Sequence, residues 1–577
     1  MNGDRMEGRL DNVERRGALV YLLLCHVGLL ISIVIADGVP PAEAYEFSIL
    51  WAYPSHLWML LIFSLCCSFA SLAITYKRDR IVAVASMLSS MLVVAFLFIL
   101  PLLRGYYYFG GSDSLYHLGS IFGIINNGHI DQLDYFALYP LLHLLGADVN
   151  LITGLDRQIL AYPILFTFYS TFAISLLALS RSLHLSREGQ AIVLIMGLTP
   201  LFGMGMLNFA PFAKATMMIP LVLLTCIRRA ELGHRNKRYS LLMVTLIVAL
   251  VFYHILAAAL FIAMMLTFDM VKSAEINVLP RLGIKVRGDG IPIKRSYPYI
   301  VLAAIISILW VPKAAIFKEI RQMFLGYFLG GTSSNGISNT IGVLGVAKLG
   351  DVLIIVLTTY GATTILLLFA SALVFAYVIV PMVKGKEIER KHWQLAAISL
   401  LFLGMTVITF LISTSFGLRP LSIVSMILVL LIGAIAPRVM LKRKGIVAVS
   451  IFIIILSSVL ILSTYPTPLN KISNWQMTET KVSGIGWVAE SLPFAPYIYY
   501  NDGDYDRASR FIGGLPIYYA HPIPDRFNLT NDVGSKWNES IVAISDQTLD
   551  FYKIQYPDYR EQWRYDQGDV QRFQASE

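Results

Sequence analysis

The chain has 577 residues, of which 56% are hydrophobic and only 14% are charged. With a mean hydropathy of +0.65, this composition excludes an ordinary soluble enzyme and predicts a polytopic membrane protein. The net charge is +9, but the basic residues are spread over short segments between apolar runs. This distribution indicates membrane topology. It argues against a nucleic-acid partner, because nucleic-acid binding would need the positive charge concentrated on one soluble face.

Apolar runs of membrane-spanning length recur along the chain. The hydrocarbon core of a bilayer is about 30 Å thick, so a helix needs about 20 apolar residues to cross it. We therefore predict an α-helical polytopic membrane protein with about thirteen transmembrane helices, several of them short. The predicted spans are residues 17–36, 57–76, 81–103, 159–179, 191–209, 215–227, 241–253, 255–271, 297–311, 352–383, 393–412, 421–436 and 446–462.

Basic residues between the spans predict the orientation, because Lys and Arg favour the cytoplasmic side of short loops. Treating residues 241–271 as one span would put the basic cluster at 272–295 on the opposite side from the other clusters. We therefore predict a hairpin of two short helices that meet at His254. The N-terminus is then cytoplasmic, the first span is a retained anchor, and the C-terminal part of this multi-pass cell-membrane protein is extracytoplasmic.

The composition divides the chain into three parts. Residues 1–80 form an N-terminal cytoplasmic segment and an extra transmembrane hairpin, and residues 81–464 form the main transmembrane module. Residues 465–577 are rich in Tyr, Trp, Asp, Asn and Pro and contain no further span, which predicts a small mixed α/β extracytoplasmic domain. The main module exposes two long outside loops, at 104–158 and 313–351. All four Cys residues fall within predicted spans, so no disulfide is expected outside.

The outside loop at 104–158 carries ionisable groups directly after a long apolar run. It reads Gly-Gly-Ser-Asp113-Ser-Leu-Tyr-His117-Leu-Gly-Ser, and after an amphipathic stretch it continues as Tyr139-Pro-Leu-Leu-His143. This pattern predicts a loop that lies on the membrane surface and presents Asp113 outside. A structural interpretation stands beside the functional one, because an Asp in this position can simply cap a helix that begins at the next residue.

The loop and the topology resemble the GT-C superfamily of polytopic glycosyltransferases, and look most like its archaeal members. The matching features are an aspartate early in a long outside loop, an Asp-x-x-x-His sequence at Asp113 and His117, and a Tyr-Pro-x-x-His segment at Tyr139 and His143. Short paired helices in the membrane and a soluble C-terminal domain outside complete the match. Two features differ. Asp113 lies on the second outside loop rather than the first, which an extra N-terminal hairpin explains, and the pair of acids that some members show near the loop start is reduced to Asp113.

The resemblance implies transfer of a sugar from a polyprenyl (dolichyl) phosphate carrier to a glycan, lipid or protein acceptor on the extracytoplasmic face. The residue types suit this chemistry, since it needs a base for the acceptor hydroxyl and a counter-charge for the phosphate leaving group. A carboxylate such as Asp113 can orient and deprotonate the hydroxyl, an effect of about a hundredfold to ten-thousandfold. Inversion at the anomeric carbon follows. His117, Tyr139 and His143 are predicted to contact the substrates.

Cations close to the outer surface of the membrane are candidates for binding the phosphate. Arg419 lies in a tight turn between two predicted spans, and its planar guanidinium suits bidentate phosphate contact. Lys214 opens a short span on the same face. Lys318 and Arg321 belong to an amphipathic segment that can cover the entry of the lipid. His254 is a further candidate, because an ionisable group at membrane depth is a functional hypothesis by default.

Each of these candidates also has a structural interpretation. Arg419 and Lys214 can anchor their helices at lipid headgroups, Lys318 and Arg321 can belong to a solvated helix face, and a neutral His254 can bond a backbone carbonyl. No spacing of metal-ligating residues approaches a recognised motif such as His-Glu-x-x-His, so no tightly held metal is predicted. A loosely bound Mg²⁺ or Mn²⁺ that bridges the phosphate stays an alternative.

Two other functions compete with this hypothesis. A lipid-linked glycan polymerase or ligase also takes carrier-bound sugars but relies on outside Arg and His residues, a role that Arg419 and His254 keep open. A secondary transporter or flippase would show paired repeats and intramembrane charges along a path, whereas this sequence has no clear internal repeat and almost no acidic residue in the predicted spans. Membrane lipids are expected partners under all three hypotheses.

Overall fold

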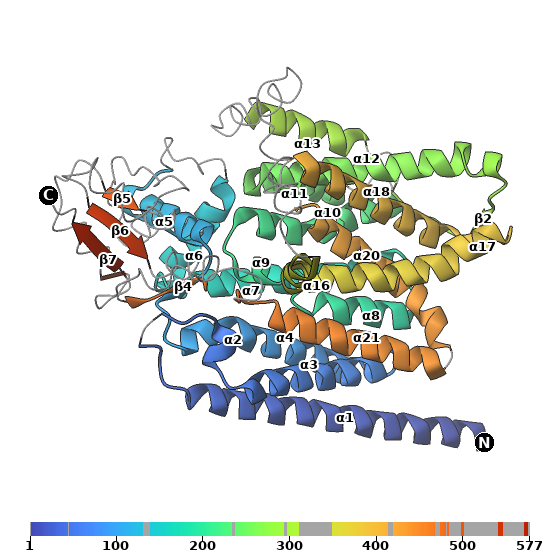
Figure 1. Ribbon diagram of the computed structural model, residues 1–577. Coiled ribbons are helices and arrows are strands. Elements are labelled where there is room, and N and C mark those ends of the chain that lie inside the picture. Colours follow the sequence, from blue (N-terminus) through green and yellow to red (C-terminus); the bar gives the residue numbers. More distant parts are fainter. Residues whose placement is uncertain are drawn as a thin grey trace.

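The computed structural model describes residues 2–43, 45–130, 139–232, 237–293, 297–310, 349–412, 419–441, 443–467, 474–479, 482–483, 498–500, 541–545 and 570–574. Most of its helices run side by side along one direction (Figure 1). The helices of eight residues or more are α1 (Asn2–Asp37), α3 (Ser55–Thr75), α4 (Arg80–Leu103), α5 (Ser112–Asn127), α6 (Pro140–Thr153), α7 (Ala161–Ser182), α8 (Arg187–Gly197), α10 (Pro211–Leu232), α11 (Lys237–Tyr253), α12 (Ile255–Asn277), α13 (Tyr297–Trp310), α16 (Leu349–Val374), α18 (Arg390–Ile412), α20 (Leu421–Met440) and α21 (Arg443–Leu462). The short elements are α2 (Ile49–Ala52), α9 (Met204–Leu207), α17 (Val380–Val383), a 3₁₀ turn (Pro280–Leu282), a π-helix (Phe375–Ile379), β1 (Tyr108–Phe109), β2 (Val286–Arg287), β3 (Ile388–Glu389), β4 (Gln476–Met477), β5 (Ile498–Tyr500), β6 (Ile541–Ser545) and β7 (Val570–Gln574).

The helices confirm the predicted fold class. Within the described residues, ten are long and apolar enough to cross a membrane: α1, α3, α4, α7, α10, α12, α18, α20, α21 and the run from α16 through α17. Each coincides with one of the thirteen predicted spans. The other three predicted spans correspond to the shorter helices α8, α11 and α13.

One of those three spans is wrong in its second half. The apolar run at 191–209 was predicted as a single helix, but α8 stops at Gly197 after 11 residues. That length rises about 16 Å, roughly half of the hydrocarbon thickness. Proline at position 200 has no N–H to continue the helix and disfavours the helical conformation at Thr199. The helix from the basic side therefore ends near mid-membrane.

An irregular stretch, residues 198–210, joins α8 to α10 and is called the broken segment below. Its only regular element is the single turn α9. Gly203, just before that turn, has a φ of +50°, a left-handed backbone that favours glycine. A Cβ on Gly203 would also lie 3.1 Å from the carbonyl oxygen of Ser463, so little space is available there. The break is thus built into the sequence at positions 200 and 203.

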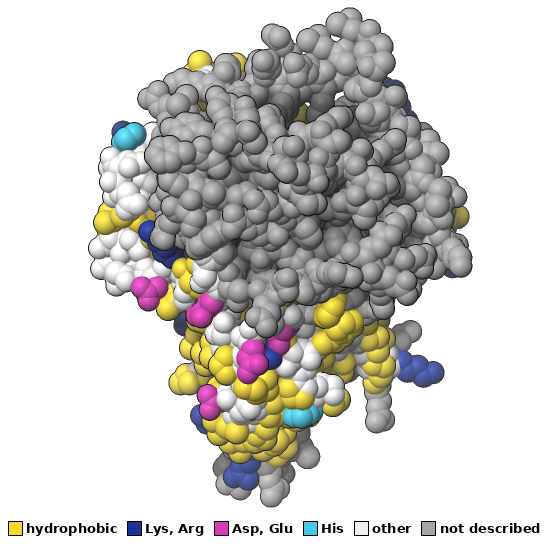
Figure 2. Space-filling view, turned by 60° about the vertical axis from the view of Figure 1, so that its left-hand side comes forward, with side chains coloured by type: hydrophobic (Ala, Val, Ile, Leu, Met, Phe, Trp, Pro, Cys, Tyr) yellow, Lys and Arg dark blue, Asp and Glu magenta, His cyan; other side chains and the backbone are white. Residues whose placement is uncertain are grey.

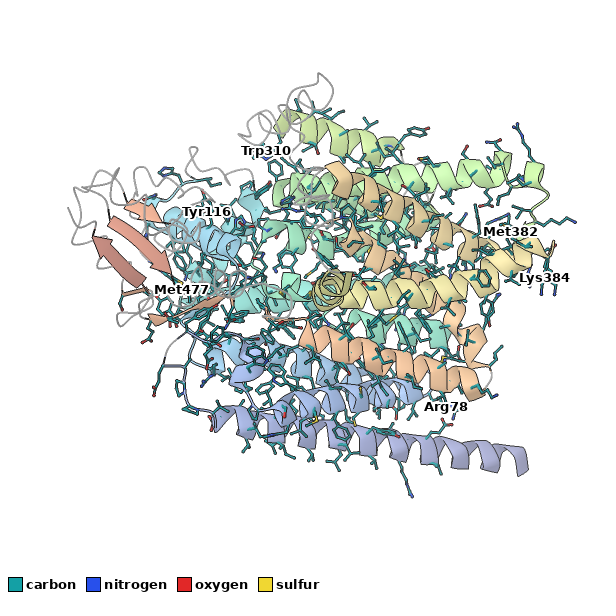
Figure 3. All side chains as sticks on the ribbon, viewed as in Figure 1. Arg78, Tyr116, Trp310, Met382, Lys384 and Met477 are labelled. Carbon is teal, nitrogen blue, oxygen red and sulfur yellow. The ribbon has the colours of Figure 1, made fainter. Side chains whose placement is uncertain are left out.

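The two ends of the bundle differ in character. Figure 3 places Arg78 and Lys384 at one end, called the basic end, and Tyr116 and Met477 at the other, called the loop end. Helices α5 and α6 lie at the loop end, outside the main bundle (Figure 1). The distribution of basic residues predicts that the basic end is cytoplasmic, and the orientation of both termini in the membrane stays a prediction.

Short strands tie loops together at both ends. At the loop end, β1 pairs antiparallel with β4, with Tyr108 opposite Met477. At the basic end, β2 pairs parallel with β3. A three-stranded sheet of order β5-β6-β7 follows in the C-terminal part, parallel between its first two strands and antiparallel between its last two. The predicted division at residues 80 and 464 stays a prediction.

Small polar residues hold the N-terminal hairpin to the bundle. Ser68 of α3 lies 2.8 Å from Ser90 of α4, and Ser71 lies 2.7 Å from Ser86, each pair measured between buried hydroxyl oxygens. Small polar side chains of this kind let membrane helices approach closely and bond to each other. The predicted extra hairpin is therefore packed against α4 rather than separate from the bundle.

Two glycines allow a close contact between α8 and α20. A Cβ added to Gly189 of α8 would lie 2.2 Å from the carbonyl oxygen of Gly433 in α20. A Cβ on Gly433 would in turn lie 2.9 Å from the carbonyl oxygen of Gly189. Because both obstacles are backbone atoms, neither can move aside cheaply. Helix α20 is also the most buried of the candidate spans, so this crossing fixes the position of α8 and of the broken segment after it.

We predict that Gly189→Ala destabilises the protein by overpacking this crossing, at a cost of about 1–3 kcal/mol. The expected result is a lower Tm in detergent and a smaller folded yield, measured by thermal unfolding and size exclusion. Gly404→Ala in α18 is the matched control, because nothing lies within 4 Å of its added Cβ and alanine favours a helix over glycine. Equal melting temperatures for the two variants would contradict the crossing as described.

Candidate active site

Asp113 lies in the first turn of α5 at the loop end. The helix begins at Ser112 with Gly111 as its N-cap, so the structural interpretation of Asp113 as the cap of a helix beginning one residue later is wrong. A carboxylate in the first turn is favoured by the positive end of the helix dipole. Asp113 is half-buried. Its position is therefore stabilised by the helix while part of the side chain stays accessible.

The next residue fastens this turn to the broken segment. The hydroxyl of Ser114 donates to Asn208 Oδ1 over 2.6 Å and accepts from the backbone N–H of Phe209 over 2.8 Å. Ser114 is fully buried. Two hydrogen bonds to a buried hydroxyl therefore fix α5 relative to a segment about 95 residues further along the chain.

The two histidines of the loop form a buried pair. Nδ1 of His117 lies 2.9 Å from Nε2 of His143, which joins α5 to α6. Both side chains are at most 2% exposed. Because one ring must donate and the other accept, the pair orders the two helices that carry Asp113 and Tyr139. Direct contact of either histidine with a substrate stays a prediction.

Four side chains from four parts of the chain form a continuous stack. The ring of Tyr139, the residue before α6, lies parallel to the ring of His254 with centroids 4.4 Å apart. The His254 ring meets the Phe212 ring edge-on at 5.2 Å. The guanidinium of Arg419 lies over the Phe212 ring, 5.1 Å from its centroid. Such contacts between cations and aromatic rings contribute about 0.5–2 kcal/mol.

His254 occupies the single-residue break between α11 and α12, as the hairpin prediction required. It is the N-cap of α12, and its Nδ1 accepts the backbone N–H of Leu256 over 3.2 Å. Burial lowers the pKa of His254 well below its usual value, and the nearby charge of Arg419 lowers this pKa further. This shift favours the neutral ring, whose Nδ1 is already occupied as an acceptor, and contact of His254 with a substrate stays a prediction.

Arg419 is part of the stack and interacts electrostatically with Asp113. Burial lowers the pKa of its guanidinium, while Tyr139 and Asp113 interact with it electrostatically and raise this pKa. Even a lowered arginine pKa leaves the group charged at neutral pH. The structure therefore brings three predicted site residues, Asp113, Tyr139 and Arg419, into one electrostatic neighbourhood.

Beside Arg419 lies a cavity of about 180 Å³. The broken segment lines one side with Phe202 and the N-terminal end of α10 adds Phe212, while α16 contributes Tyr360 and Thr363. Helix α16 has non-helical backbone angles at Tyr360, so the helix is kinked where it borders the cavity. Most of the lining area is apolar, and Arg419 is the charged residue among the described side chains that line it.

The hydroxyl groups of Thr363, Ser422 and Ser425 in the wall of this cavity have partners within the protein. Thr363 and Ser425 lie 2.9 Å apart between their hydroxyl oxygens, and the Ser422 hydroxyl donates to the carbonyl oxygen of Arg419 over 2.8 Å. The second bond also fixes the backbone of the turn that carries the guanidinium. An apolar group can therefore lie in this cavity with an anionic end at Arg419 and without leaving these three hydroxyls unpaired.

Lys214 does not anchor its helix at the lipid headgroups, because its side chain is inside the protein. It is fully buried in α10, and its Nζ donates to the carbonyl oxygens of Asn208 at 2.9 Å and of Met206 at 3.4 Å. The ammonium group thus satisfies two carbonyls of the broken segment. This contact is structural, and a phosphate contact by Lys214 stays a prediction.

The remaining predicted residues lie outside the described part of the chain. Lys318 and Arg321 both fall between α13 and α16, in the undescribed stretch that holds most of the second outside loop. No group of three or more His, Cys, Asp or Glu side chains among the described residues is arranged to hold a metal ion. The loosely bound Mg²⁺ or Mn²⁺ stays a prediction.

Sequence reasoning missed several residues of this site. Phe212, Tyr360 and the pair of Ser114 and Asn208 were not predicted, although Ser114 is adjacent to Asp113 in the sequence. A signal was present in Asn-Phe-Ala-Pro-Phe at 208–212, where aromatic residues flank a proline that begins a helix after an apolar run.

Comparisons with known proteins were made at the level of sequence and of structure. No protein-family model matches the chain, and a search of curated proteins finds no match. Solved structures of an oligosaccharyltransferase from Archaeoglobus fulgidus are similar to this structure. Its apo form has a TM-score of 0.45 at 14% identity, over 78% of this chain and 66% of that chain.

Two further structures of that archaeal enzyme are similar over comparable lengths. One is tethered to an acceptor peptide with an NVT sequon and has a TM-score of 0.45 at 13% identity, over 76% of this chain and 64% of that chain. The other is a complex with an inhibitory peptide and a dolichol-phosphate, with a TM-score of 0.47 at 13% identity, over 81% of this chain and 70% of that chain. This chain thus spans slightly less than two thirds of the length of the first two.

We predict that the two roles of His254 can be separated by substitution. His254→Asn keeps a side-chain acceptor for the N–H of Leu256, because Asn is a good N-cap, but removes the ring that supports Tyr139 and Phe212. His254→Ala removes both. The alanine variant should therefore be less stable than the asparagine variant by about 1 kcal/mol, the usual value of an N-cap, measured by chemical unfolding in detergent. Equal stabilities would show that the cap contributes nothing.

Proposed function

We propose that this protein is a membrane glycosyltransferase of the GT-C type. In this proposal it transfers a sugar from a polyprenyl phosphate carrier to a glycan, lipid or protein acceptor at the loop end of the bundle. The observation that supports the proposal most strongly is the setting of Arg419, which lines an apolar cavity and interacts electrostatically with the half-buried carboxylate of Asp113.

The cavity and Arg419 suit the two halves of the donor. The isoprenoid chain is a hydrocarbon and matches the apolar wall beside the broken segment, whereas the phosphate is an anion and matches the guanidinium. Phe212 and the Ser422 hydroxyl hold the Arg419 side chain and its backbone from two directions. A preorganised cation stabilises charge that develops on a leaving phosphate more effectively than a mobile one.

Asp113 then acts on the acceptor. The Asp113 carboxylate takes the proton of the acceptor hydroxyl, and the hydroxyl oxygen forms a new bond to the anomeric carbon of the sugar. The bond from that carbon to the phosphate oxygen breaks, and its electron pair stays on the phosphate, beside Arg419. Attack from the face opposite the phosphate inverts the anomeric configuration. Holding base, acceptor and donor together also lowers the entropic part of the barrier.

The remaining side chains of the stack serve this geometry indirectly. Tyr139 and His254 support Phe212, and Phe212 lies under Arg419. The His117 and His143 pair holds α5 and α6 together behind them. The proposal therefore assigns Asp113 to proton transfer, Arg419 to the phosphate, and these aromatic rings to positioning.

Transfer from a radiolabelled polyprenyl phosphate sugar by the purified protein in nanodiscs is the direct test. We predict that Asp113→Asn lowers kcat by a factor of about 10² to 10⁴, the usual contribution of a general base, and leaves the Tm nearly unchanged. His129→Asn, an exposed substitution just beyond the C-terminal end of α5, serves as the control. Full activity of the Asp113→Asn variant would overturn the assignment of the base.

A second prediction concerns the donor phosphate. Arg419→Ala should raise the Kd for polyprenyl phosphate about tenfold or more, while the KM for the acceptor changes less than about twofold, because only the donor carries the phosphate. Arg419→Lys should lie between the two, since it keeps the charge but loses the planar fork. Both constants are measured by titration and by initial rates.

The matched control for Arg419 is Arg157→Ala. Arg157 also lies over a phenylalanine ring, 4.5 Å from the centroid of Phe122, but it does not belong to the cavity wall. Its removal should leave donor affinity unchanged. Equal losses of donor and acceptor binding in Arg419→Ala would contradict a phosphate role for Arg419.

A further inference from the structure

The loop between α1 and α3 contains one carboxylate that is turned into the protein. Figure 2, in which the loop end comes forward, shows Asp and Glu side chains among hydrophobic ones in the lower part of the view. Glu43 of this loop is exposed, whereas the Glu46 side chain is only 20% exposed. Glu46 lies beside the end of α4, close to the start of the segment that leads to Asp113.

Glu46 binds two residues of that segment through its side chain. Nε of Arg104, the C-cap of α4, donates to both carboxylate oxygens of Glu46 over 3.0 and 3.1 Å, and Nη2 of Arg104 donates to Oε1 as well. The hydroxyl of Tyr106 donates to Oε2 over 2.6 Å. Burial and the neighbouring Glu46 carboxylate raise the pKa of Tyr106 well above its usual value, so its hydroxyl remains protonated as a donor.

The backbone of Glu46 binds the strand on the other side of the same segment. The Nδ2 group of Asn474 donates to the Glu46 carbonyl oxygen over 2.8 Å, and the Glu46 N–H donates to Oε1 of Gln476 over 2.7 Å. Gln476 belongs to β4, which pairs with β1. A single residue of the N-terminal hairpin thus contacts β4 and the segment that leads into β1.

Contacts of the neighbouring backbone bring the two loops still closer. The N–H of Ala42 donates to the Arg104 carbonyl oxygen over 2.8 Å. Gly105 has a φ of +76°, and a Cβ there would lie 2.9 Å from Cβ of Pro41. Only glycine fits this turn without strain, so α4 leaves the bundle directly against the hairpin loop.

From this clamp the chain reaches Asp113 in a few residues. The N–H of Gly110 donates to the carbonyl oxygen of Trp475 over 3.1 Å, and Ser114 is bound to Asn208 and Phe209. Asp113 is therefore held between an anchor three residues before it and an anchor one residue after it. The earlier anchor is the bond to Trp475, the residue before β4, and Glu46 in turn binds Gln476 of β4.

We propose that Glu46 is a positioning residue, whose carboxylate and backbone hold the β1 and β4 pair in place and thereby fix Asp113 relative to Arg419. This inference rests on the proposed function and gives the extra N-terminal hairpin a role in it. Glu46 touches neither the cavity wall nor the substrates. Its effect is on geometry, and a displacement of about 1 Å at a reacting group can reduce a rate about a hundredfold.

The test compares Glu46→Gln and Glu46→Ala with the wild-type protein in nanodiscs. Amide hydrogen exchange of a peptide that covers residues 105–111 reports the clamp without any substrate. We expect exchange in this peptide to be at least tenfold faster in Glu46→Ala, with a smaller increase in Glu46→Gln, which keeps an acceptor for Tyr106. We also expect kcat for sugar transfer to fall about tenfold or more while the KM for the donor changes less than twofold.

Two further variants complete the design. Glu43→Gln removes a carboxylate from the same loop and should change neither exchange nor kcat, because its side chain is exposed. Tyr106→Phe removes one hydrogen bond but keeps the ion pair, so it should give a smaller effect of the same kind. It takes the place of Glu46→Ala if that variant does not fold. Wild-type exchange rates in folded Glu46→Ala and in Tyr106→Phe would overturn the clamp.

The outcomes separate this inference from the proposed function. Faster exchange with an unchanged kcat would overturn a positioning role and leave only an architectural one. If the wild-type protein transfers no polyprenyl phosphate sugar, the proposed function fails, while the exchange experiment still decides whether Glu46 holds the segment.

Discussion

The need to satisfy backbone groups inside a membrane governs this structure. In hydrocarbon an unpaired N–H or C=O costs several kcal/mol, so a chain can leave the helical conformation at membrane depth only where other groups replace the lost bonds. The broken segment meets this condition with partners from three helices. Tyr169 of α7 donates to the carbonyl oxygen of Leu198, Lys214 of α10 donates to the carbonyl oxygens of Met206 and Asn208, and Ser114 of α5 accepts from the N–H of Phe209.

The cavity beside Arg419 follows from the same break. A continuous helix from α8 to the loop end would occupy part of the space that residues such as Phe202 now border. The glycine crossing between α8 and α20 fixes the position of α8, and the kink at Tyr360 bends α16 along the other side. Among the described residues, an apolar pocket lined by one arginine thus results from a broken helix, a close helix crossing and a kink.

The sequence predicted the helices well and their interruptions poorly. Long apolar runs show that a helix exists, because burial in lipid dominates the energy of any such segment. They do not show that α8 ends at Gly197, since residues 198–209 remain apolar, although Pro200 and Gly203 carried the signal. Asp113 could be predicted because it is a charged residue beside an apolar run. Phe212 could not, because it is one of 31 Phe residues and only the folded structure brings it into contact with Arg419 and His254. The partners of Glu46 lie 58 and 428 positions away, beyond any local pattern.

The pairing of β1 with β4 has a consequence for biosynthesis. Tyr108 and Met477 face each other across the pair, and Tyr465 donates to the carbonyl oxygen of Leu97 close by. These partners are separated by nearly 370 residues, and all helices from α5 to α21 are made between them. A ribosome that has released Asp113 into its final compartment must still insert every later span before the strand that supports it exists. The nascent chain therefore carries the Asp113 carboxylate long before it carries the strand that pairs with the segment leading to Asp113.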